Sequence, residues 1–195
     1  MSPRIGADLN TIVQTAVAIA DQDGFYEVTL TRVAQKLNIR PPSLYNHIDG
    51  LHELRKQMAI YGLHELYAAL LEANASVKEL DQGLHAIGEA YVDFARRHPG
   101  LYEATFQAPD PSDPEVERAG ADIVMFAVHF LSSSYGLEGD ELIHATRGLR
   151  SFLHGFASLE QKGEFRMHLK RDESLHVIID TFIAGIRKMD TNCNE

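Results

Sequence analysis

Apolar residues recur along almost the whole chain with the spacing of amphipathic helices. The first stripe is Leu9, Ile12, Val13, Ala16, Ile19 and Ala20, and similar stripes return through the rest of the 195 residues. Stretches with the alternating pattern of a half-buried strand are absent. The sequence therefore predicts an all-α fold of about nine helices.

Residues that start or stop helices bound these stripes. Asp8 and Thr29 are expected to cap helices at their N-termini, and Gly24 is expected to end the first helix. A capping box at 76–79 predicts the start of another helix, which ends before Pro99. The other expected helices cover 9–23, 29–37, 41–48, 51–73, 101–107, 115–135, 140–161 and 172–188.

Composition excludes several classes of protein. Hydrophobic residues make up 45% of the chain, which is too many for a disordered chain. No apolar run is long enough to span a bilayer, and no leader-like segment begins the sequence, so we expect a cytoplasmic protein without membrane association. The single cysteine, Cys193, lies in a polar tail and excludes an internal disulfide and a cysteine-based zinc site.

Charge is distributed unevenly along the chain. The formal net charge is −10, yet residues 1–60 hold six basic and six acidic side chains and are neutral overall. All of the excess acid therefore belongs to residues 61–195. This asymmetry indicates two functional parts, of which the N-terminal part is better suited to a polyanionic partner.

The N-terminal segment has the spacing of a helix-turn-helix. Two short helices, at 29–37 and 41–48, are separated by the three residues Asn38, Ile39 and Arg40. Asn38 is suited to a left-handed turn, and Leu44 and Ile48 are the positions that must face inward. The outward residues of the second helix are Arg40, Pro41, Ser43, Tyr45, Asn46 and His47. Spacing alone is equally consistent with a helical hairpin that has a polar surface.

The residues themselves resemble the DNA-binding segment of the TetR family of bacterial repressors. That family has an alanine, a turn and then Ser/Thr-Leu-Tyr-x-His followed by an apolar residue. The matching positions are Ala34, Ile39, Ser43, Leu44, Tyr45 and His47, with Ile48 in the final apolar place. Two positions differ from the pattern: Asn38 replaces the common turn glycine, and Leu51 stands where a basic residue is frequent.

The resemblance implies roles for individual residues. Tyr45 and His47 would contact phosphates, and Thr31 would anchor the first helix of the pair on the DNA backbone. The remaining implied contacts with phosphates or base edges are Arg40, Pro41, Ser43 and Asn46, with Arg40 the best candidate for reading a guanine. His52 or Arg55 would replace the missing basic residue at the start of the next helix. A DNA-binding domain at 1–50 would precede an effector-binding and dimerisation domain at 51–195.

The C-terminal part resembles the TetR family only in its layout. The resemblance implies a small-molecule effector and a homodimer formed by the helices near 140–161 and 172–188. The stretch 152–160 is similar to a subgroup with a Trp-His-Gly signature, although Leu153 stands in the tryptophan position. Aromatic, histidine and arginine side chains on these helices are the candidates to line an effector site: Phe94, His98, Tyr102, Phe106, Phe126, Arg147 and His154. The acidic body favours a neutral or cationic effector, while Arg147 and Arg150 leave an anion possible.

A helical enzyme or metal-storage protein is the alternative interpretation. Two Glu-x-x-His motifs, Glu141 to His144 and Glu173 to His176, resemble those of di-iron bundles. Both lie near the N-terminal ends of helices expected to be antiparallel, so they would lie roughly 30 Å apart. No nucleophile motif and no glycine-rich phosphate loop occurs, and the other histidines read as hydrogen-bonded groups. We therefore expect a DNA-binding transcriptional regulator, a repressor released by its effector, with no catalytic residues, cofactor or metal.

Overall fold

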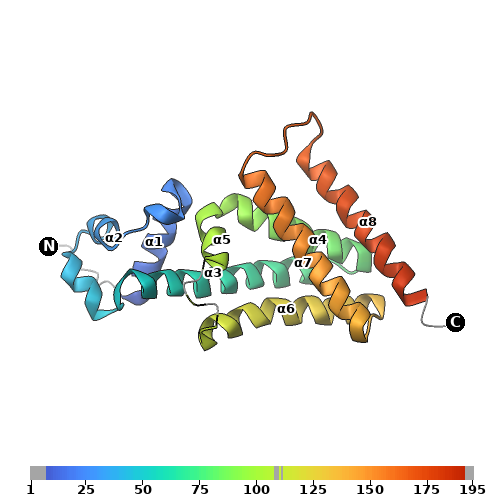
Figure 1. The fold of residues 1–195 in the computed structure, drawn as a ribbon, viewed down its shortest axis with the longest axis horizontal. Helices are drawn as coiled ribbons and strands as arrows, with labels where there is room; N and C mark the ends of the chain where they lie inside the picture. Colours follow the sequence, from blue (N-terminus) through green and yellow to red (C-terminus); the bar gives the residue numbers. More distant parts are fainter. Residues whose placement is uncertain (1–7, 108–109, 111, 192–195) are drawn as a thin grey trace. The chain divides into compact units, whose positions relative to one another are not determined.

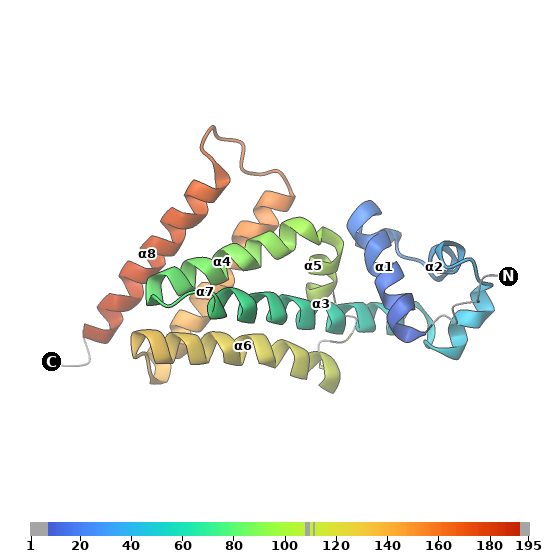
Figure 2. The same ribbon diagram turned by 180° about the vertical axis from the view of Figure 1, so that it is seen from behind.

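The computed structural model describes residues 8–107, 110 and 112–191, and Figures 1 and 2 show it from opposite sides. This described part of the chain contains eight α-helices, two short 3₁₀ helices and no strand, which confirms the predicted all-α class. In chain order the elements are α1 (Leu9–Asp23), η1 (Phe25–Glu27), α2 (Leu30–Lys36), η2 (Pro41–Asn46), α3 (Gly50–Ala75), α4 (Leu80–Arg97), α5 (Pro99–Phe106), α6 (Pro114–Tyr135), α7 (Gly139–Gln161) and α8 (Arg171–Thr191).

Local sequence signals set several helix ends as predicted. The Asp8 carboxylate accepts a hydrogen bond from the backbone N–H of Thr11 at 2.7 Å, which lowers the pKa of Asp8. The Thr29 hydroxyl likewise accepts from the N–H of Arg32 at 3.2 Å, at the start of α2. Gly24 ends α1 with a φ of 108°, a value that favours glycine.

One predicted detail is wrong. The capping box at 76–79 does not form, because the Ser76 hydroxyl donates to the carbonyl of Ala73 and α4 begins only at Leu80. The second helix of the N-terminal pair, expected over 41–48, is present as the 3₁₀ helix Pro41–Asn46. Its six residues make two turns of this tighter helix. Cys193 lies outside the described residues.

By packing, the chain divides into two compact units. Unit 1 comprises Met1–Glu65 and Arg97–Gly120, and unit 2 comprises Leu66–Arg96 and Ala121–Glu195. Unit 1 therefore holds α5 and the first residues of α6 in addition to the N-terminal helices. Both α3 and α6 begin in unit 1 and continue into unit 2. The functional boundary expected after residue 50 remains a proposal.

Asp21 and Gly100 join α1 to α5 within unit 1. The Asp21 carboxylate accepts hydrogen bonds from the backbone N–H groups of Gly100 and Leu101, both at 2.9 Å, and lies 3.1 Å from Nδ1 of His98. It thus satisfies donors at the N-terminus of α5 that have no partner in their own helix. A β-carbon on Gly100 would lie 2.1 Å from the carbonyl carbon of Ala20, so only glycine permits this approach of the two helices.

Lys56 joins α3 to the start of α6 within the same unit. Its ammonium group lies 2.8 Å from Glu115 and 3.2 Å from Asp113, and the Lys56 side chain is only 15% exposed. These hydrogen bonds raise the pKa of Lys56 above its ordinary value, so the ammonium group stays charged. The two helices that pass into unit 2 are therefore tied together where they begin.

Unit 2 has a partly buried ion-pair cluster at one end. Figure 1 shows α7 and α8 as the two arms of a hairpin. Near its loop, Arg96 of α4 makes two hydrogen bonds to the nearly buried carboxylate of Glu160, at 2.7 and 2.9 Å, and a third to Asp172 at 2.7 Å. This pairing fixes the end of α4 against α7 and α8. Among the described residues, no helix is both long and apolar enough to span a membrane.

We expect Gly100→Ala to destabilise the protein by about 1–3 kcal/mol, because its new methyl group would displace the α1 backbone. Gly120→Ala is the matched control, since it also changes a helical glycine of unit 1 but has no atom within 4 Å of the new β-carbon. It should raise the free energy of unfolding by up to about 1 kcal/mol. Urea unfolding monitored by circular dichroism measures both values. Equal stability of the two variants would contradict the close contact.

Candidate functional site

The turn after α2 is a Schellman motif centred on Asn38. Asn38 has a φ of 55° and is the sole described non-glycine residue with a positive φ. Its N–H donates to the carbonyl of Gln35, and the N–H of Ile39 donates to the carbonyl of Ala34, both at 3.0 Å. The left-handed turn predicted for Asn38 is therefore present. It ends α2, whose last residue is Lys36 and whose C-cap is Leu37.

The next residues set the direction of η2. Arg40 is extended, with φ −79° and ψ 138°, as a residue before proline must be. Pro41 and Pro42 then open the helix, where no intrahelical N–H is required of them. Leu44 and Ile48 are 0% and 4% exposed and anchor the segment to the core, as predicted.

The other side chains from Arg40 to His47 are all exposed. We call the surface made by Arg40, Pro41, Ser43, Tyr45, Asn46 and His47 the recognition face. Tyr45 is the strongest indication that this face binds a ligand, because its large aromatic side chain is 61% exposed. The recognition face presents a guanidinium group, an imidazole, an amide and two hydroxyls, which are groups that bind phosphates and base edges.

Neighbouring elements carry the other predicted contact residues. Thr31 on α2 and His52 at the start of α3 are both exposed. Arg32 is held by ion pairs with Asp23 and Glu27. Arg55, the alternative to His52, has its guanidinium carbon 5.2 Å from the centre of the Phe25 ring and is partly buried. His52 is therefore the better placed of the two to meet a ligand.

Unit 2 contains a mainly apolar cavity of about 50 Å³, room for a few water molecules. Its walls come from α3, α4, α6 and α7, and the only charged side chain among them is Arg150. The lining residues are Leu70, Ile87, Tyr91, Ile123, Val124, Phe126, Ala127, Phe130, Thr146, Leu149, Arg150 and Leu153. An apolar cavity with a few polar groups is the usual form of a small-molecule site.

Residues 84–182 match a family described as "Tetracyclin repressor-like, C-terminal domain". The chain is 40% identical over 186 residues to the uncharacterized HTH-type transcriptional regulator YobS of Bacillus subtilis, covering 95% of this chain and 96% of that one. The chain belongs to the TetR family of transcriptional regulators. Membership of a family of transcriptional regulators opposes the interpretation as a metal-storage protein.

Solved structures share the fold of this TetR-family chain. A protein of unknown function from Rhodococcus sp. RHA1 has a TM-score of 0.83 at 21% identity, covering 95% of this chain and 98% of that one. A TetR variant from Acinetobacter baumannii AYE, solved in complex with minocycline, has a TM-score of 0.69 at 18% identity, covering 94% of this chain and 98% of that one. Both similarities concern the fold alone.

The structure does not bring the seven candidate effector residues of this TetR-family chain together. Phe126 is the one that lines the cavity of unit 2. His98, Tyr102 and Phe106 belong to unit 1, where His98 faces Asp21 and the rings of Tyr102 and Phe106 are 5.1 Å apart. In unit 2, Phe94 is 3% exposed and packs in the core.

The two remaining candidates lie on α7. Arg147 is exposed and does not line the cavity. Burial, with help from Arg150 and Lys162, lowers the pKa of His154, so its imidazole is uncharged at neutral pH. Thr146 was not among the residues predicted from the sequence, and Arg150 was named only as a partner for an anionic effector. The sequence does carry a signal for both as lining residues. They stand one helical turn apart, on the same face of α7 as Leu149 and Leu153.

The turn should tolerate glycine but not a β-branched residue. Asn38→Gly should leave the free energy of unfolding unchanged or slightly raised, because glycine adopts a φ of 55° without steric cost. Asn38→Val should lower it by about 1–2 kcal/mol, the cost of the left-handed conformation. Urea unfolding of both variants checks this. If Asn38→Val is as stable as Asn38→Gly, the turn does not depend on the left-handed residue.

Proposed function

We propose that the chain is a repressor that binds operator DNA through unit 1 and leaves it when a small molecule binds in unit 2. The observation that carries the proposal is the recognition face. From Arg40 to Ile48 the chain buries only two apolar anchors, Leu44 and Ile48, and exposes every side chain able to contact DNA. Membership of the TetR family supports DNA as the partner.

Contacts with DNA divide into two kinds. Tyr45 and His47 would bind phosphates, with Thr31 and His52 on either side of them. Arg40 would read a guanine, because a guanidinium group can donate two parallel hydrogen bonds to one base edge. Pro41, Ser43 and Asn46 would complete the surface against the groove. The proposed domain boundary after residue 50 falls at the start of α3, so the DNA-binding domain would end where α3 begins.

We further propose a homodimer formed by α7 and α8. Several apolar residues of α7 and α8 are buried within the chain itself, namely Leu149, Phe156, Leu175, Ile179, Ile183 and Ile186. A second set of apolar side chains remains exposed on the same two helices: Ile143, Leu159, Val177 and Ile178. A two-fold dimer is also what would place two recognition faces about 34 Å apart, one turn of DNA.

The cavity of unit 2 is the proposed effector site. Its single charged side chain, Arg150, favours an apolar molecule with a carboxylate or similar acceptor, in place of the neutral or cationic effector suggested by net charge. The structure of an Acinetobacter baumannii TetR variant with minocycline supports a small molecule as the ligand class. The cavity is small, so such a molecule would have to widen it.

Helices α3 and α6 supply a route for release. Both line the cavity, α3 through Leu70 and α6 through residues such as Phe126. Both begin in unit 1, where Lys56 joins them. A molecule that widens the cavity would move α6 relative to α3 and strain this joint.

Finer assignments complete the proposal. We assign no catalytic role or cofactor, and we place the protein in the cytoplasm with the DNA it regulates. Membership of the Trp-His-Gly subgroup is also proposed, with Leu153, His154 and Gly155 standing for its signature.

Selection from a random pool of double-stranded oligonucleotides tests the function directly. The protein should enrich a palindrome whose half-sites lie about one helical turn apart, and gel shifts of that sequence should weaken as salt rises. Failure to enrich any sequence over the starting pool would contradict DNA recognition.

Variants of the recognition face should separate its two kinds of contact. Tyr45→Phe and His47→Ala should weaken binding to all sequences and lower the salt slope by about one for each lost phosphate contact. Arg40→Ala should cost about 1–3 kcal/mol on the selected sequence and relax its base preference. Fluorescence anisotropy at several salt concentrations measures these effects. Unchanged binding in all three variants would mean that another surface binds DNA.

Light scattering should give twice the 21.8 kDa chain mass at micromolar concentration. Ile178→Glu should shift the protein towards the monomer, because it places a charge in the proposed interface. Met125→Glu is the control, since Met125 is 60% exposed but lies on α6. A monomeric unmodified protein would exclude the dimer.

Matched probes should reveal the charge preference of the cavity. Octanoate should raise the melting temperature more than octan-1-ol or octylamine, and Arg150→Gln should abolish the difference between octanoate and octan-1-ol. Arg147→Gln, which changes an arginine outside the cavity, should leave that difference intact. A stronger effect of octylamine would contradict the role of Arg150.

A further inference from the structure

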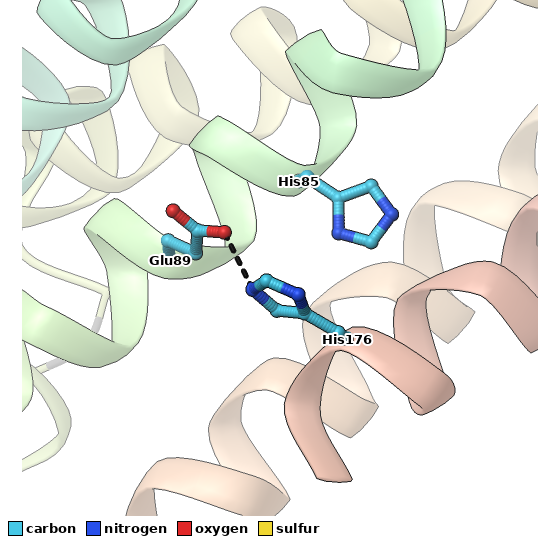
Figure 3. Close-up of side chains that lie close together, drawn as sticks. All are labelled: His85, Glu89 and His176. Atoms are coloured by element: carbon cyan, nitrogen blue, oxygen red, sulfur yellow. Dashed lines mark ion pairs between the residues drawn. The ribbon is translucent and has the colours of Figure 1, made fainter. Parts of the chain in front are cut away.

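Two pairs of metal-binding residue types face each other across α4 and α8 in unit 2. His85 and Glu89 stand one turn apart on α4, and His176 and Asp180 stand one turn apart on α8. Figure 3 shows the side chains of His85, Glu89 and His176 converging between the two helices. One ligand atom from each of these three lies within 4.8 Å of the other two.

The four residues already contact one another in pairs. Nε2 of His176 lies 2.7 Å from Oε1 of Glu89, and Nε2 of His85 lies 2.9 Å from Oδ1 of Asp180. The two imidazole rings are 5.1 Å apart, centre to centre. Glu173, the acid of the Glu-x-x-His motif that contains His176, pairs instead with Lys170 and takes no part. The cluster is thus built across helices and not by that motif.

Close approach of the helices makes this convergence possible. A β-carbon on Gly88 of α4 would lie 2.7 Å from Cδ1 of Ile179 on α8. Gly88 and Ile179 are the immediate neighbours of Glu89 and Asp180 in the sequence. Side chains from both helices can therefore reach one point without being fully extended.

His85 has one ring nitrogen in use and one without a partner. Its Nε2 is paired with the Asp180 carboxylate, and since a carboxylate can only accept, Nε2 carries the proton. In the neutral ring Nδ1 then has a bare lone pair, and it is a buried atom with no hydrogen-bond partner in the described structure. In Figure 3 the nitrogen next to the attachment carbon lies on the side of the ring that faces Glu89 and His176.

We propose that Nδ1 of His85, the Glu89 carboxylate and Nε2 of His176 bind a divalent transition-metal ion of the zinc type. Two imidazoles and one carboxylate are a set that Zn²⁺ accepts, with a fourth position left for water, whereas Ca²⁺ and Mg²⁺ prefer oxygen ligands alone. Asp180 would hold the proton on Nε2 of His85, the arrangement found behind many metal-bound histidines.

Binding would require a small contraction of the cluster. Ligand atoms about 2.0–2.1 Å from a tetrahedral ion lie roughly 3.4 Å apart, against a present limit of 4.8 Å. Glu89 and His176 are both about half exposed, so their side chains can turn to close the distance. The ion would join α4 to α8 and stabilise unit 2. This inference does not depend on the proposed DNA or effector sites.

Isothermal titration calorimetry of the untagged, EDTA-treated protein with ZnCl₂ tests the site. One Zn²⁺ per chain should bind and raise the melting temperature, and Co²⁺ should give the visible absorption of a tetrahedral complex. His85→Gln and His176→Gln should each abolish both signals. Asp180→Asn should weaken Zn²⁺ binding about 10- to 100-fold.

Two controls separate loss of the site from loss of the fold. His168→Gln and Glu173→Gln change exposed residues of unit 2 outside the cluster and should bind Zn²⁺ as the unmodified chain does. The metal-free melting temperatures of His85→Gln and His176→Gln should stay within a few degrees of the unmodified protein. Absence of Zn²⁺ binding by the unmodified chain, or equal binding by His176→Gln, would overturn the proposal. Unchanged affinity in Asp180→Asn would overturn the role given to Asp180.

Discussion

The left-handed turn at Asn38 is the constraint on which the recognition face depends. Its two backbone hydrogen bonds end α2 at once, and the proline that follows forces Arg40 into an extended conformation. The chain therefore enters η2 in one direction only. Because Leu44 and Ile48 must then point into the core, the polar residues between and before them have no alternative but solvent. Exposure of Tyr45 follows from this geometry.

Packing extends unit 1 beyond the helix-turn-helix. Asp21 holds the N-terminus of α5, and at Gly100 the backbone of α5 approaches that of α1 too closely for any side chain to fit between them. Lys56 adds the start of α6. Segments that follow residue 96 in the sequence are thus part of the same compact unit as the recognition face. A shift in the position of α5 or of the start of α6 is therefore a shift within unit 1 itself.

Features fixed by neighbouring residues could be predicted from the sequence. Capping by Asp8 and Thr29, the turn at Asn38 and the inward positions of Leu44 and Ile48 each depend on the chemistry of a few adjacent positions. The prediction of a capping box at Ser76 was wrong because the hydroxyl of serine can equally bond to a preceding carbonyl.

Features assembled from distant segments could not be predicted in this way. The cavity takes its walls from four helices, and no local pattern shows which of their residues will meet. Phe94 and Tyr102 were predicted to line an effector site because they are aromatic, but both are buried in the core. Helical spacing also could not reveal that Gly100 meets the backbone of Ala20, or that His85 and His176 face each other. Each of these depends on the approach of helices that no local pattern encodes.

Hydrogen exchange measured by mass spectrometry, with and without the selected DNA, tests the central claim most directly. If the recognition face binds DNA, backbone amides of residues 43–52 should exchange more slowly in the complex, together with those at the start of α2. Amides of α7 near the Arg96–Glu160 ion pair should show no comparable slowing. Slower exchange confined to other segments, with residues 43–52 unaffected while the DNA is bound, would contradict the account.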